Sequence, residues 1–488
     1  MTGTSTRPTE LIADPERVVA RLFLPGEGLP STHSRAAKIA QRVLALTPEQ
    51  TATLARGLLA DFTTRHVDTA AILRANARAV GSRVPGAVPA SGDQALVLGA
   101  SFTAEYAIEG AALCNPSVVE HPDQSGLDAD QFRVAIALRA IGEGHLSCIE
   151  FAEAIIGPGE QWTFTERTAP PATAAVSPGR WRTEHLRASI EHEQQLTELS
   201  SATLEALPAE FSTTDVERSI QSLPAELLHH RDSASSLNAL RDMVASAYVA
   251  VFEEGTALAQ RVLLPVAVEE DHGMEDARFV HFRHDDGTTE NRATYTAYDG
   301  RDIAPRLITS PDLRTFAIHR LSGSAARNKG MALFPRPVGR THLALSRTDG
   351  ESISLARSTD GVIWRDETTI HVPTEPWELV QTGNCGSPIE TPHGWLVLTH
   401  GVGPLRVYSI GALLLDLHNP ARVLRRAGRP ILKPAASSRN GYVPNVVYSC
   451  GGIVRDGRLW IPYGIGDARV AVFSTDLETL IDSLEPVD

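Results

Sequence analysis

A strand followed by an aspartate recurs at a nearly constant interval in the second half of the chain. The segments TSPDLRTF, RSTDGVIW, LLLDLHNP and FSTDLETL each place an aspartate where a predicted strand ends, at Asp312, Asp360, Asp416 and Asp476. Successive aspartates are 48, 56 and 60 residues apart. An interval of roughly 50 residues is typical of propeller blades, in which each blade is one four-stranded sheet. The repeat therefore favours a radial array of small sheets.

Other tracts after Val262 have the same character. THLALSR, GWLVLTHGV and GRLWIPYGIG are short, rich in β-branched or aromatic residues, and bounded by Gly, Pro or Asp. This part of the chain has room for about four blades, and the strand-like text at 100–160 can supply another. We therefore predict a mainly β protein, a five-bladed β-propeller whose catalytic groups are scattered around one axial pocket.

Two stretches have helical patterns instead. In TPEQTATLARGLLADF, Thr47 is a plausible N-cap, Pro48 occupies the first helical position and Gln50 closes a capping box. Residues 181–254 are helical again. These segments predict an N-terminal helical element and a helical insertion in the propeller.

The predicted domain boundaries follow from these patterns. They are an N-terminal helical region at 1–95, first propeller strands at 96–170, a helical insertion or lid at 171–258, and the remaining blades with the active site at 259–488. The insertion either packs on one face of the propeller, or serves as a lid or an oligomer interface, so a homo-oligomer is a possible assembly.

Charge and cysteine content exclude several function classes. The net charge of −14 and the absence of a Lys/Arg-rich run argue against nucleic acid and anionic membranes as partners. No apolar run approaches the roughly 18 residues that span a bilayer, and no secretory signal is visible. The four cysteines are far apart, which disfavours zinc, thioredoxin-like and disulfide readings. We expect a cytoplasmic protein with buried thiols, no metal and no cofactor.

The segment MEDARFVHF has three charges beside a strand that leads into a core. Burying a charge is costly unless it is paired, so Asp276 and Arg278 either lie on a solvated loop or are held for chemistry. Polar residues also occur in other β segments where a pure core would have none. They are Asn328, Lys329, Arg336, Arg347, Glu390, His400, Arg406, Asn445, Tyr463 and Asp467. Each alone fits a structural role, but the excess of Arg and Lys suits a phosphate or carboxylate ligand.

The ordered motifs MEDARF, YTAYDG, NKGMALFPR, GWLVLTHGV, YVPNVVYSCGG and YGIGDARV resemble those of glycoside hydrolase family 130. The likeness covers roughly residues 262–488, and ALCNPSVV with GEGHLSCIEF resembles the N-terminal strands of longer members. This resemblance implies a five-bladed propeller that acts on β-mannosides. Most such enzymes are inverting phosphorylases that release mannose 1-phosphate, and some are inverting β-1,2-mannosidases.

The resemblance also implies roles for residues. Asp276 falls on the general acid, which in the family is thought to reach the leaving oxygen through a sugar hydroxyl. Ala277 stands where the family usually has Pro. Asp467 matches a sugar-binding carboxylate of the donor subsite. The expected substrate-binding residues are Asn115, Arg278, Tyr298, Asn445, Tyr463 and Asp467. The expected phosphate-binding residues are Asn328, Lys329, Arg336, Arg347, His400 and Arg406.

Phosphorolysis and hydrolysis make different demands. A phosphorylase needs a cationic cradle for phosphate but no protein base, whereas an inverting hydrolase needs a second carboxylate that activates water. The Arg- and Lys-rich strands favour phosphate as co-substrate. Glu390, in PIET, is the candidate base if the nucleophile is water. We predict phosphorolysis of β-manno-oligosaccharides, with a β-1,2 linkage by analogy, and keep the hydrolase as the alternative.

A non-catalytic carbohydrate-binding propeller is the second alternative. Such a protein would keep its aromatic residues but would not need Asp276. A serine or cysteine hydrolase is disfavoured, because no GxSxG elbow follows a strand. A nucleotide site is disfavoured as well, because GEGH is not a GxGxxG motif.

Overall fold

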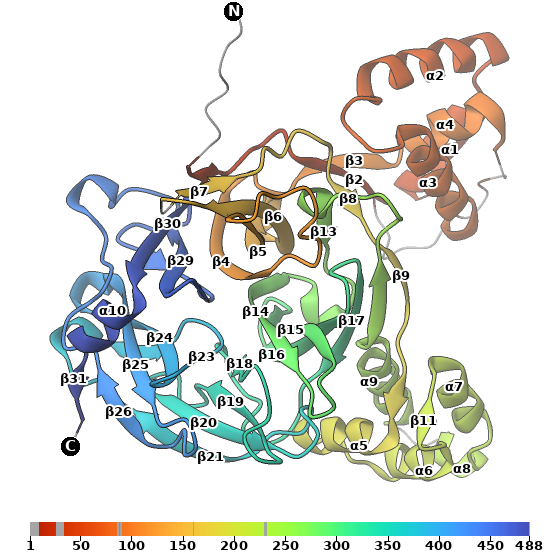
Figure 1. The fold of residues 1–488 in the computed structure, drawn as a ribbon. Helices are drawn as coiled ribbons and strands as arrows, with labels where there is room; N and C mark the ends of the chain where they lie inside the picture. The colour runs from red at the N-terminus through yellow and green to blue at the C-terminus, as the bar shows by residue number, and fades with distance from the viewer. Residues whose placement is uncertain are drawn as a thin grey trace, which may run out of the picture. The chain divides into compact units, whose positions relative to one another are not determined.

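The computed structural model describes residues 9–25, 34–84, 87, 90–159, 161–228 and 232–487. The chain divides into two compact units. Unit 2 comprises residues 14–110 and 168–173, and unit 1 comprises residues 1–13, 111–167 and 174–488. Figure 1 shows the helices and strands of both units in chain order.

Unit 2 is mainly helical. Its elements are β2 (Val18–Leu22), α1 (Arg35–Leu44), α2 (Pro48–Phe62), α3 (Thr69–Arg83), α4 (Gly92–Ala100), β3 (Thr103–Ala107) and β8 (Ala172–Thr173). The predicted capping box is confirmed, because the Thr47 hydroxyl accepts from the Gln50 amide while the Gln50 side chain accepts from the Thr47 amide. The antiparallel pair β2–β3 was not predicted.

The core of unit 2 forms where α4 crosses α3. Leu96, Val97 and Leu98 of α4 are buried in one apolar cluster with residues of α1 and α3. The crossing is close at Gly99, where a Cβ atom would lie 1.8 Å from the Leu73 carbonyl oxygen. Only glycine fits there, so this residue fixes how tightly the two helices pack.

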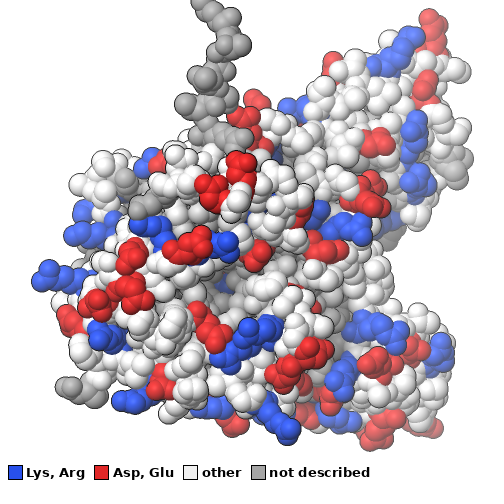
Figure 2. Space-filling model, in the orientation of Figure 1, with Lys and Arg blue, Asp and Glu red and all other residues white. Residues whose placement is uncertain are grey.

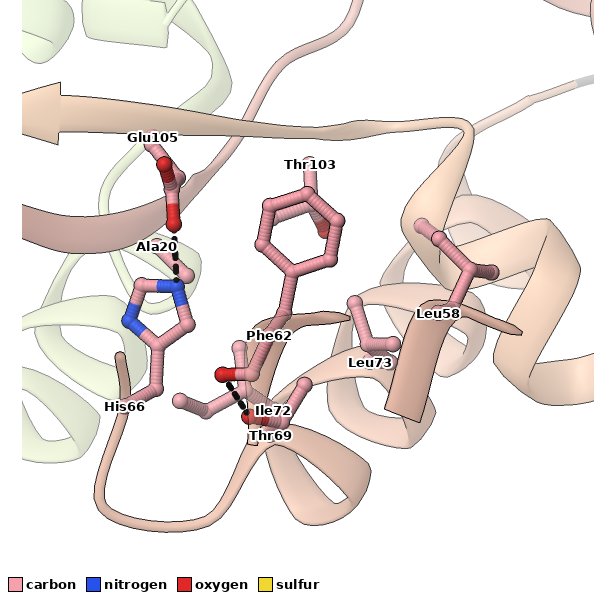
Figure 3. A pocket seen from close by; sticks show the side chains of 10 residues that line it. Ala20, Leu58, Phe62, His66, Thr69, Ile72, Leu73, Thr103 and Glu105 are labelled. Atoms are coloured by element: carbon pink, nitrogen blue, oxygen red, sulfur yellow. Dashed lines mark hydrogen bonds and ion pairs between the residues drawn. The ribbon is translucent and has the colours of Figure 1, made fainter. Parts of the chain in front are cut away.

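A small cavity of about 90 Å³ lies in this unit, between apolar side chains and a histidine–glutamate pair (Figure 3). The Glu105 carboxylate accepts from both Arg65 nitrogens at 2.8 Å and contacts His66 Nε2 at 2.9 Å. The volume is well below the roughly 300 Å³ of typical small-molecule sites. The contacts of Glu105 therefore link the segment after α2 to strand β3.

Unit 1 holds most of the β structure. Its largest sheet contains β4 (Ala112–Glu120), β5 (Phe132–Ile141), β6 (Ser147–Gly157), β7 (Gln161–Phe164), β9 (Ala175–Pro178), β12 (Tyr248–Val251), β13 (Arg261–Leu263), β14 (Gly273–Arg283), β15 (Thr289–Tyr298), β16 (Ile303–Ser310) and β17 (Thr315–Arg320). Two antiparallel groups, β4–β7 and β14–β17, are joined in it by a single parallel pair, Gly273 with Ser147.

Three further sheets follow in chain order. The second contains β18 (Ala332–Leu333), β19 (His342–Ser346), β20 (Ile353–Ser358) and β21 (Arg365–His371). The third contains β22 (Gln381–Asn384), β23 (Ile389–Thr391), β24 (Gly394–Val402), β25 (Tyr408–Leu415), β26 (Val423–Arg426) and β31 (Glu485–Pro486). The fourth contains β1 (Leu11–Ile12), β27 (Val447–Tyr448), β28 (Ile453–Arg455), β29 (Arg458–Ile465) and β30 (Arg469–Asp476).

The remaining elements of unit 1 are short or helical. They are β10 (Trp181–Arg182), α5 (Thr183–His192), α6 (Glu198–Ala206), β11 (Glu210–Phe211), α7 (Thr213–Gln221), α8 (Ala225–Leu228), α9 (Ser233–Ala245), α10 (Leu477–Ser483) and six 3₁₀ turns, η1 (Glu143–His145), η2 (Leu258–Gln260), η3 (Val268–Glu270), η4 (Pro376–Glu378), η5 (Pro404–Arg406) and η6 (Ala436–Ser438). None of the helices in the described ranges is long and apolar enough to cross a membrane.

The aspartate repeat of the sequence marks equivalent turns. In four groups of strands, Asp312, Asp360 and Asp416 follow β16, β20 and β25, and Asp476 is the last residue of β30. Each aspartate Oδ1 accepts backbone amide hydrogens two or three residues further on, at 2.7–2.9 Å. The sequence between β6 and β7 reads GPGE from Gly157 and has no such aspartate. The mainly β prediction is confirmed, and Figure 1 shows these groups following one another around a common centre within unit 1.

Candidate active site

The candidate site lies at two bulges in neighbouring strands. In β4 the pairing with β5 jumps from Cys114 to Ser117, and in β14 the pairing with β15 jumps from Glu275 to Arg278. Asn115 (φ +52°) and Asp276 (φ +56°) occupy the bulges in the left-handed conformation that Asn and Asp tolerate best. A bulge re-aims a side chain, and here both side chains turn toward one cavity.

This cavity has a volume of about 510 Å³, within the usual range of small-molecule sites. Its lining residues are Asn115, Asp276, Arg278, Lys329, Arg347, Gln381, His400, Leu405, Arg406, Tyr408, Val443, Pro444, Val446, Tyr448 and Asp467. They lie in or next to strands of the four larger sheets of unit 1. Of the described residues that line it, none belongs to the helical insertion.

Asp276 is held by a network of donors. Asn115 Nδ2 donates to its Oδ1 at 2.6 Å, and Arg139 Nη1 lies 3.4 Å from the same oxygen. Burial raises the pKa of this carboxyl, but the guanidinium groups of Arg139 and Arg278 lower it more, and the pKa of Asp276 lies below its ordinary value. Asp276 is therefore ionised at neutral pH.

Arg139 and Glu275 lie beside Asp276, and neither was among the site residues predicted from the sequence. Arg139 Nη2 and Lys329 Nζ each donate to the Glu275 carboxylate at 2.6 Å. Arg139 thus bridges Glu275 and Asp276. The available signal was Arg139, one of two arginines in the otherwise apolar strand FRVAIALRAI.

Two buried guanidinium groups approach the cavity. Arg278 donates through Nε to the Cys385 carbonyl, through Nη1 to the Asp276 carbonyl and through Nη2 to the Tyr448 hydroxyl, at 2.7–3.1 Å. Arg347 is 8% exposed, donates from Nη2 to the Gly350 carbonyl, and has a buried Nε without a partner. Within the described residues no carboxylate lies within ion-pairing distance of Arg347.

His400 and Gly383 lie beside these two arginines, which together form the cationic wall of the cavity. The His400 ring is buried against Tyr448, with ring centres 4.9 Å apart, and its Nδ1 has no partner. Burial, with the nearby charges of Arg347 and Arg278, holds the pKa of His400 well below its ordinary value. A Cβ atom on Gly383 would lie 2.4 Å from Arg347 Nε and 2.5 Å from His400 Cε1, so glycine allows both side chains to pack there.

The pKa of Asp467 is shifted in the opposite direction to that of Asp276. Asp467 lies in the β29–β30 turn with φ +53°, and its buried Oδ1 has no hydrogen-bond partner. Burial and the negative charge of Asp276 raise the pKa of Asp467 to about 6, although Arg139 counteracts them. The cavity therefore contains two carboxyl groups whose pKa values are pushed apart.

Four other predicted site residues do not line the cavity. Asn328 has φ +63° and its side chain accepts from the Lys329 amide. Asn445 has φ +64° and stands between two lining residues. The Tyr298 ring lies 5.8 Å from Lys329 Nζ. Tyr463 packs, half-buried, against the apolar cluster of the third and fourth sheets.

Glu390 and Arg336 are not brought into the cavity with Asp276. Arg336 donates to the Glu390 carboxylate through Nε at 2.9 Å, and Arg283 Nη2 lies 3.7 Å from it. Glu390 lines a separate hollow together with Arg283 and residues of β14 beyond the bulge. The hydrogen bonds from Arg336 lower the pKa of Glu390 below its ordinary value. The opposite charges of Arg336 and Glu390 thus offset each other outside the candidate site.

The four cysteines are all free and buried, as expected. Among the described residues no group of three or more His, Cys, Asp or Glu side chains could hold a metal ion. On the face drawn in Figure 2, acidic and basic side chains are interspersed around a central hollow, with no extended patch of one sign.

Comparison with known proteins assigns the chain to a family. The model of glycoside hydrolase family 130, described as beta-1,4-mannooligosaccharide phosphorylase, matches residues 240–486. A beta-1,2-mannobiose phosphorylase from Thermoanaerobacter sp. (strain X514) is 33% identical over 237 residues, which are 47% of this chain and 76% of that protein. The chain belongs to glycoside hydrolase family 130.

Other relatives are matched over a smaller part. A 1,2-beta-oligomannan phosphorylase from the same Thermoanaerobacter strain is 36% identical over 155 residues, 31% of this chain and 52% of that protein. The chain thus spans about half the length of this relative. The structure of beta-1,2-mannobiose phosphorylase from Listeria innocua, in complex with beta-1,2-mannobiose, has a TM-score of 0.45 and 20% identity, and covers 78% of this chain and 93% of that one.

Proposed function

We propose that this protein cleaves β-mannosidic linkages by inverting phosphorolysis and releases α-mannose 1-phosphate. A phosphate oxygen would form the new bond to C1 of the terminal mannose as the glycosidic C1–O bond breaks. Asp276 would deliver the proton that the leaving oxygen needs, as the general acid. The supporting observation is the buried Arg347, whose Nε has no partner and which forms no ion pair with a carboxylate of the described residues, in the same cavity as Asp276.

The cationic wall suits an oxyanion. Arg278, Arg347 and the exposed Arg406 line the cavity with Lys329, whereas Asp276 and Asp467 are the two acidic residues among the lining residues. Phosphate would satisfy free guanidinium donors in a charge-assisted geometry. His400, neutral at working pH, would serve as a hydrogen-bond partner rather than as a charge.

Phosphate binding would also favour protonation of Asp276, the proposed general acid. A dianion beside Arg278 and Lys329 offsets the positive charge that holds the pKa of Asp276 low, so the pKa should rise and the carboxyl should take up a proton. Binding of sulfate, which does not titrate near neutral pH, should then be accompanied by proton uptake. Calorimetry in buffers of different ionisation enthalpy measures this uptake, which should be lost in Asp276→Asn.

Asp467 and Asn115 fit the sugar-binding role. Both line the cavity, and Asp467 Oδ1 and Asn115 Oδ1 are buried acceptors without partners. Mannose hydroxyls would donate to them. Three of the relatives are named for activity on 1,2-linked mannosides, and we therefore place β-1,2-manno-oligosaccharides first among the substrates.

The proposed scaffold is the five-bladed propeller. The groups β4–β7 and β14–β17 would be two blades, because their strands are paired at one position, Gly273 with Ser147, and the other three sheets would be one blade each. The Cys450 amide donates to the Pro116 carbonyl at 2.8 Å, which connects the last sheet to the first strand. A cytoplasmic location and a homo-oligomeric state remain proposals from sequence.

Hydrolysis with Glu390 as base has less support, because Glu390 is paired with Arg336 outside the cavity. One assay separates the two reactions. The protein is incubated with β-1,2-mannobiose, with and without about 10 mM phosphate, in excess of the usual KM range, and the products are followed by NMR. Mannose 1-phosphate formed only with phosphate supports the proposal, whereas free mannose as the only new product in both tubes overturns it.

The general acid is tested in the same assay. Asp276→Asn keeps the shape and the left-handed backbone but cannot donate the proton. We expect it to lose at least about 10²-fold in turnover while its thermal unfolding stays close to that of the wild type. Near-normal turnover in this variant would remove Asp276 from the mechanism.

A further inference from the structure

Leu405 is an apolar side chain in an otherwise polar site. It lies in the η5 turn between β24 and β25, lines the cavity that contains Asp276, and is 90% exposed. Single exposed leucines are common on protein surfaces. Leu405 differs because of its position at the cavity and its backbone conformation.

The backbone of Leu405 is costly for this residue type. Its φ is +60°, in the left-handed region, where a bulky non-glycine residue is strained. The only other left-handed leucine in the described chain, Leu313 (φ +53°), is fully buried in the main core, so packing offsets its strain. Leu405 has no such compensation within the chain.

A second loop shows that the turn does not need leucine. The η1 loop between β5 and β6 closes with a bond from the Gly142 amide to the Leu146 carbonyl, as the η5 loop closes from Gly403 to Val407. Its two left-handed residues are Gly144 and His145, which correspond to Leu405 and Arg406. Glycine therefore makes the same turn at lower cost.

The surroundings of Leu405 are apolar too. Val443 and Pro444, both exposed, line the same cavity. The Val443 amide is already bonded to the Gly466 carbonyl, and proline has no amide hydrogen. This rim, defined as Leu405, Val443 and Pro444, offers little to a sugar hydroxyl but a good surface to a hydrocarbon group.

We propose that the apolar rim binds an alkyl or aryl group on the leaving-group side of the substrate, so that the preferred acceptor is a mannoside with an apolar aglycone. This inference rests on the proposed phosphorylase function. The polar interior holds the transferred mannose and phosphate, and the rim covers the part of the substrate that leaves. Contact with the Leu405 side chain compensates its strain only when such a group is bound.

The test uses the reverse reaction, in which mannose 1-phosphate donates mannose to methyl β-mannoside or to octyl β-mannoside, kept below its micelle concentration. We expect kcat/KM for the octyl acceptor to be about tenfold higher in the wild type, from burial of the chain against the rim. In Leu405→Gly this octyl-to-methyl ratio should fall to near one. The Gly144 precedent predicts that the variant folds and melts no lower than the wild type.

The matched control is Leu379→Ala. Leu379 is 68% exposed and close to the start of β22, but it does not line the cavity. This variant should keep the wild-type ratio. An equal ratio in wild type and Leu405→Gly would overturn the inference, as would a dimer that dissociates in Leu405→Gly without any change in the ratio, which would make Leu405 an interface residue.

Binding separates this inference from the proposed function. Calorimetric titration with the octyl and methyl mannosides is run on the same variants, without donor. If no mannosyl transfer occurs with any acceptor, the proposed function fails. Tighter octyl binding that is lost in Leu405→Gly would still support the rim, and equal binding of the two ligands by the wild type would refute it.

Discussion

Replacing Asp467 with Asn should stabilise unit 1 at pH 8 and do so much less at pH 4.5. The pKa of Asp467 is raised from 3.8 to about 6 because its carboxyl is buried beside Asp276. In the folded state this carboxyl keeps its proton to a higher pH than in the unfolded chain. Its contribution to stability is therefore complete below pH 3.8 and is lost as the pH rises through about 6. Asn carries no charge and does not suffer this loss.

The magnitude follows from the pKa difference. Each pKa unit is worth 1.36 kcal/mol, which sets an upper bound of about 3 kcal/mol at pH 8. Because Asp467 is partly exposed, we expect a gain of about 1–3 kcal/mol in the free energy of unfolding. The gain should shrink by more than half at pH 4.5.

The assay is urea unfolding followed by tryptophan fluorescence between pH 4.5 and pH 8. All six tryptophans of the chain belong to unit 1, so the signal reports this unit alone. Asp456→Asn is the matched control, since Asp456 also has a left-handed backbone (φ +49°) but its side chain is 84% exposed. A stability difference between Asp467→Asn and wild type that stays constant across this pH range would refute the reasoning.

Two further substitutions test the division between site and surface. Gly383→Ala should displace Arg347 and His400, because its Cβ would lie within 2.5 Å of both side chains. We expect a loss of about 1–3 kcal/mol in the free energy of unfolding and weaker binding of phosphate in calorimetry. An unchanged affinity for phosphate would contradict the packing argument. Glu390→Gln should alter kcat/KM by less than about twofold. It should lower the free energy of unfolding by at most about 1 kcal/mol, because the ion pair of Glu390 with Arg336 is partly exposed. A large loss of turnover would instead restore Glu390 as a candidate base.

Local sequence signals predicted much of the fold. The capping box at Thr47 and the aspartate turns at Asp312, Asp360 and Asp416 depend on contacts between near neighbours in the chain, and such contacts leave a short-range pattern. The sequence did not predict β2 and β3, which pair across about 80 residues. That pairing is set by tertiary packing and not by a local pattern.

The candidate site was predicted in part for the same reason. Asp276, Arg278 and Asp467 stand in recognisable motifs and do line one cavity. Arg336 and Glu390 also occur in polar β segments. The sequence of a strand does not show which of its ends lies near the cavity, so these two residues could not be separated from the site residues. Arg139 was missed because its role appears only when β5 lies beside β14, more than 130 residues away in the chain.

The helical segment of unit 1 is, in topological terms, the loop of one β-hairpin. Strands β9 and β12 pair antiparallel from Ala175–Val251 to Pro178–Tyr248, and the Gly179 amide then donates to the Ala247 carbonyl at 2.9 Å. Residues 180–246 thus leave and return at one point and bury a core of their own around Trp181 and Phe211.

A side branch closed in this way is a cassette with its own core, which also contacts the sheets through His185 with Asp360 and Ser189 with Ser322. The entropy of closing a loop grows only slowly with its length, so the branch can be lengthened, shortened or exchanged while the strands that carry it keep their register. Joining Gly179 to Ala247 through a two-residue turn would convert the cassette back into an ordinary hairpin. The enzyme can therefore acquire or lose a whole surface without any change in the strands that hold Asp276.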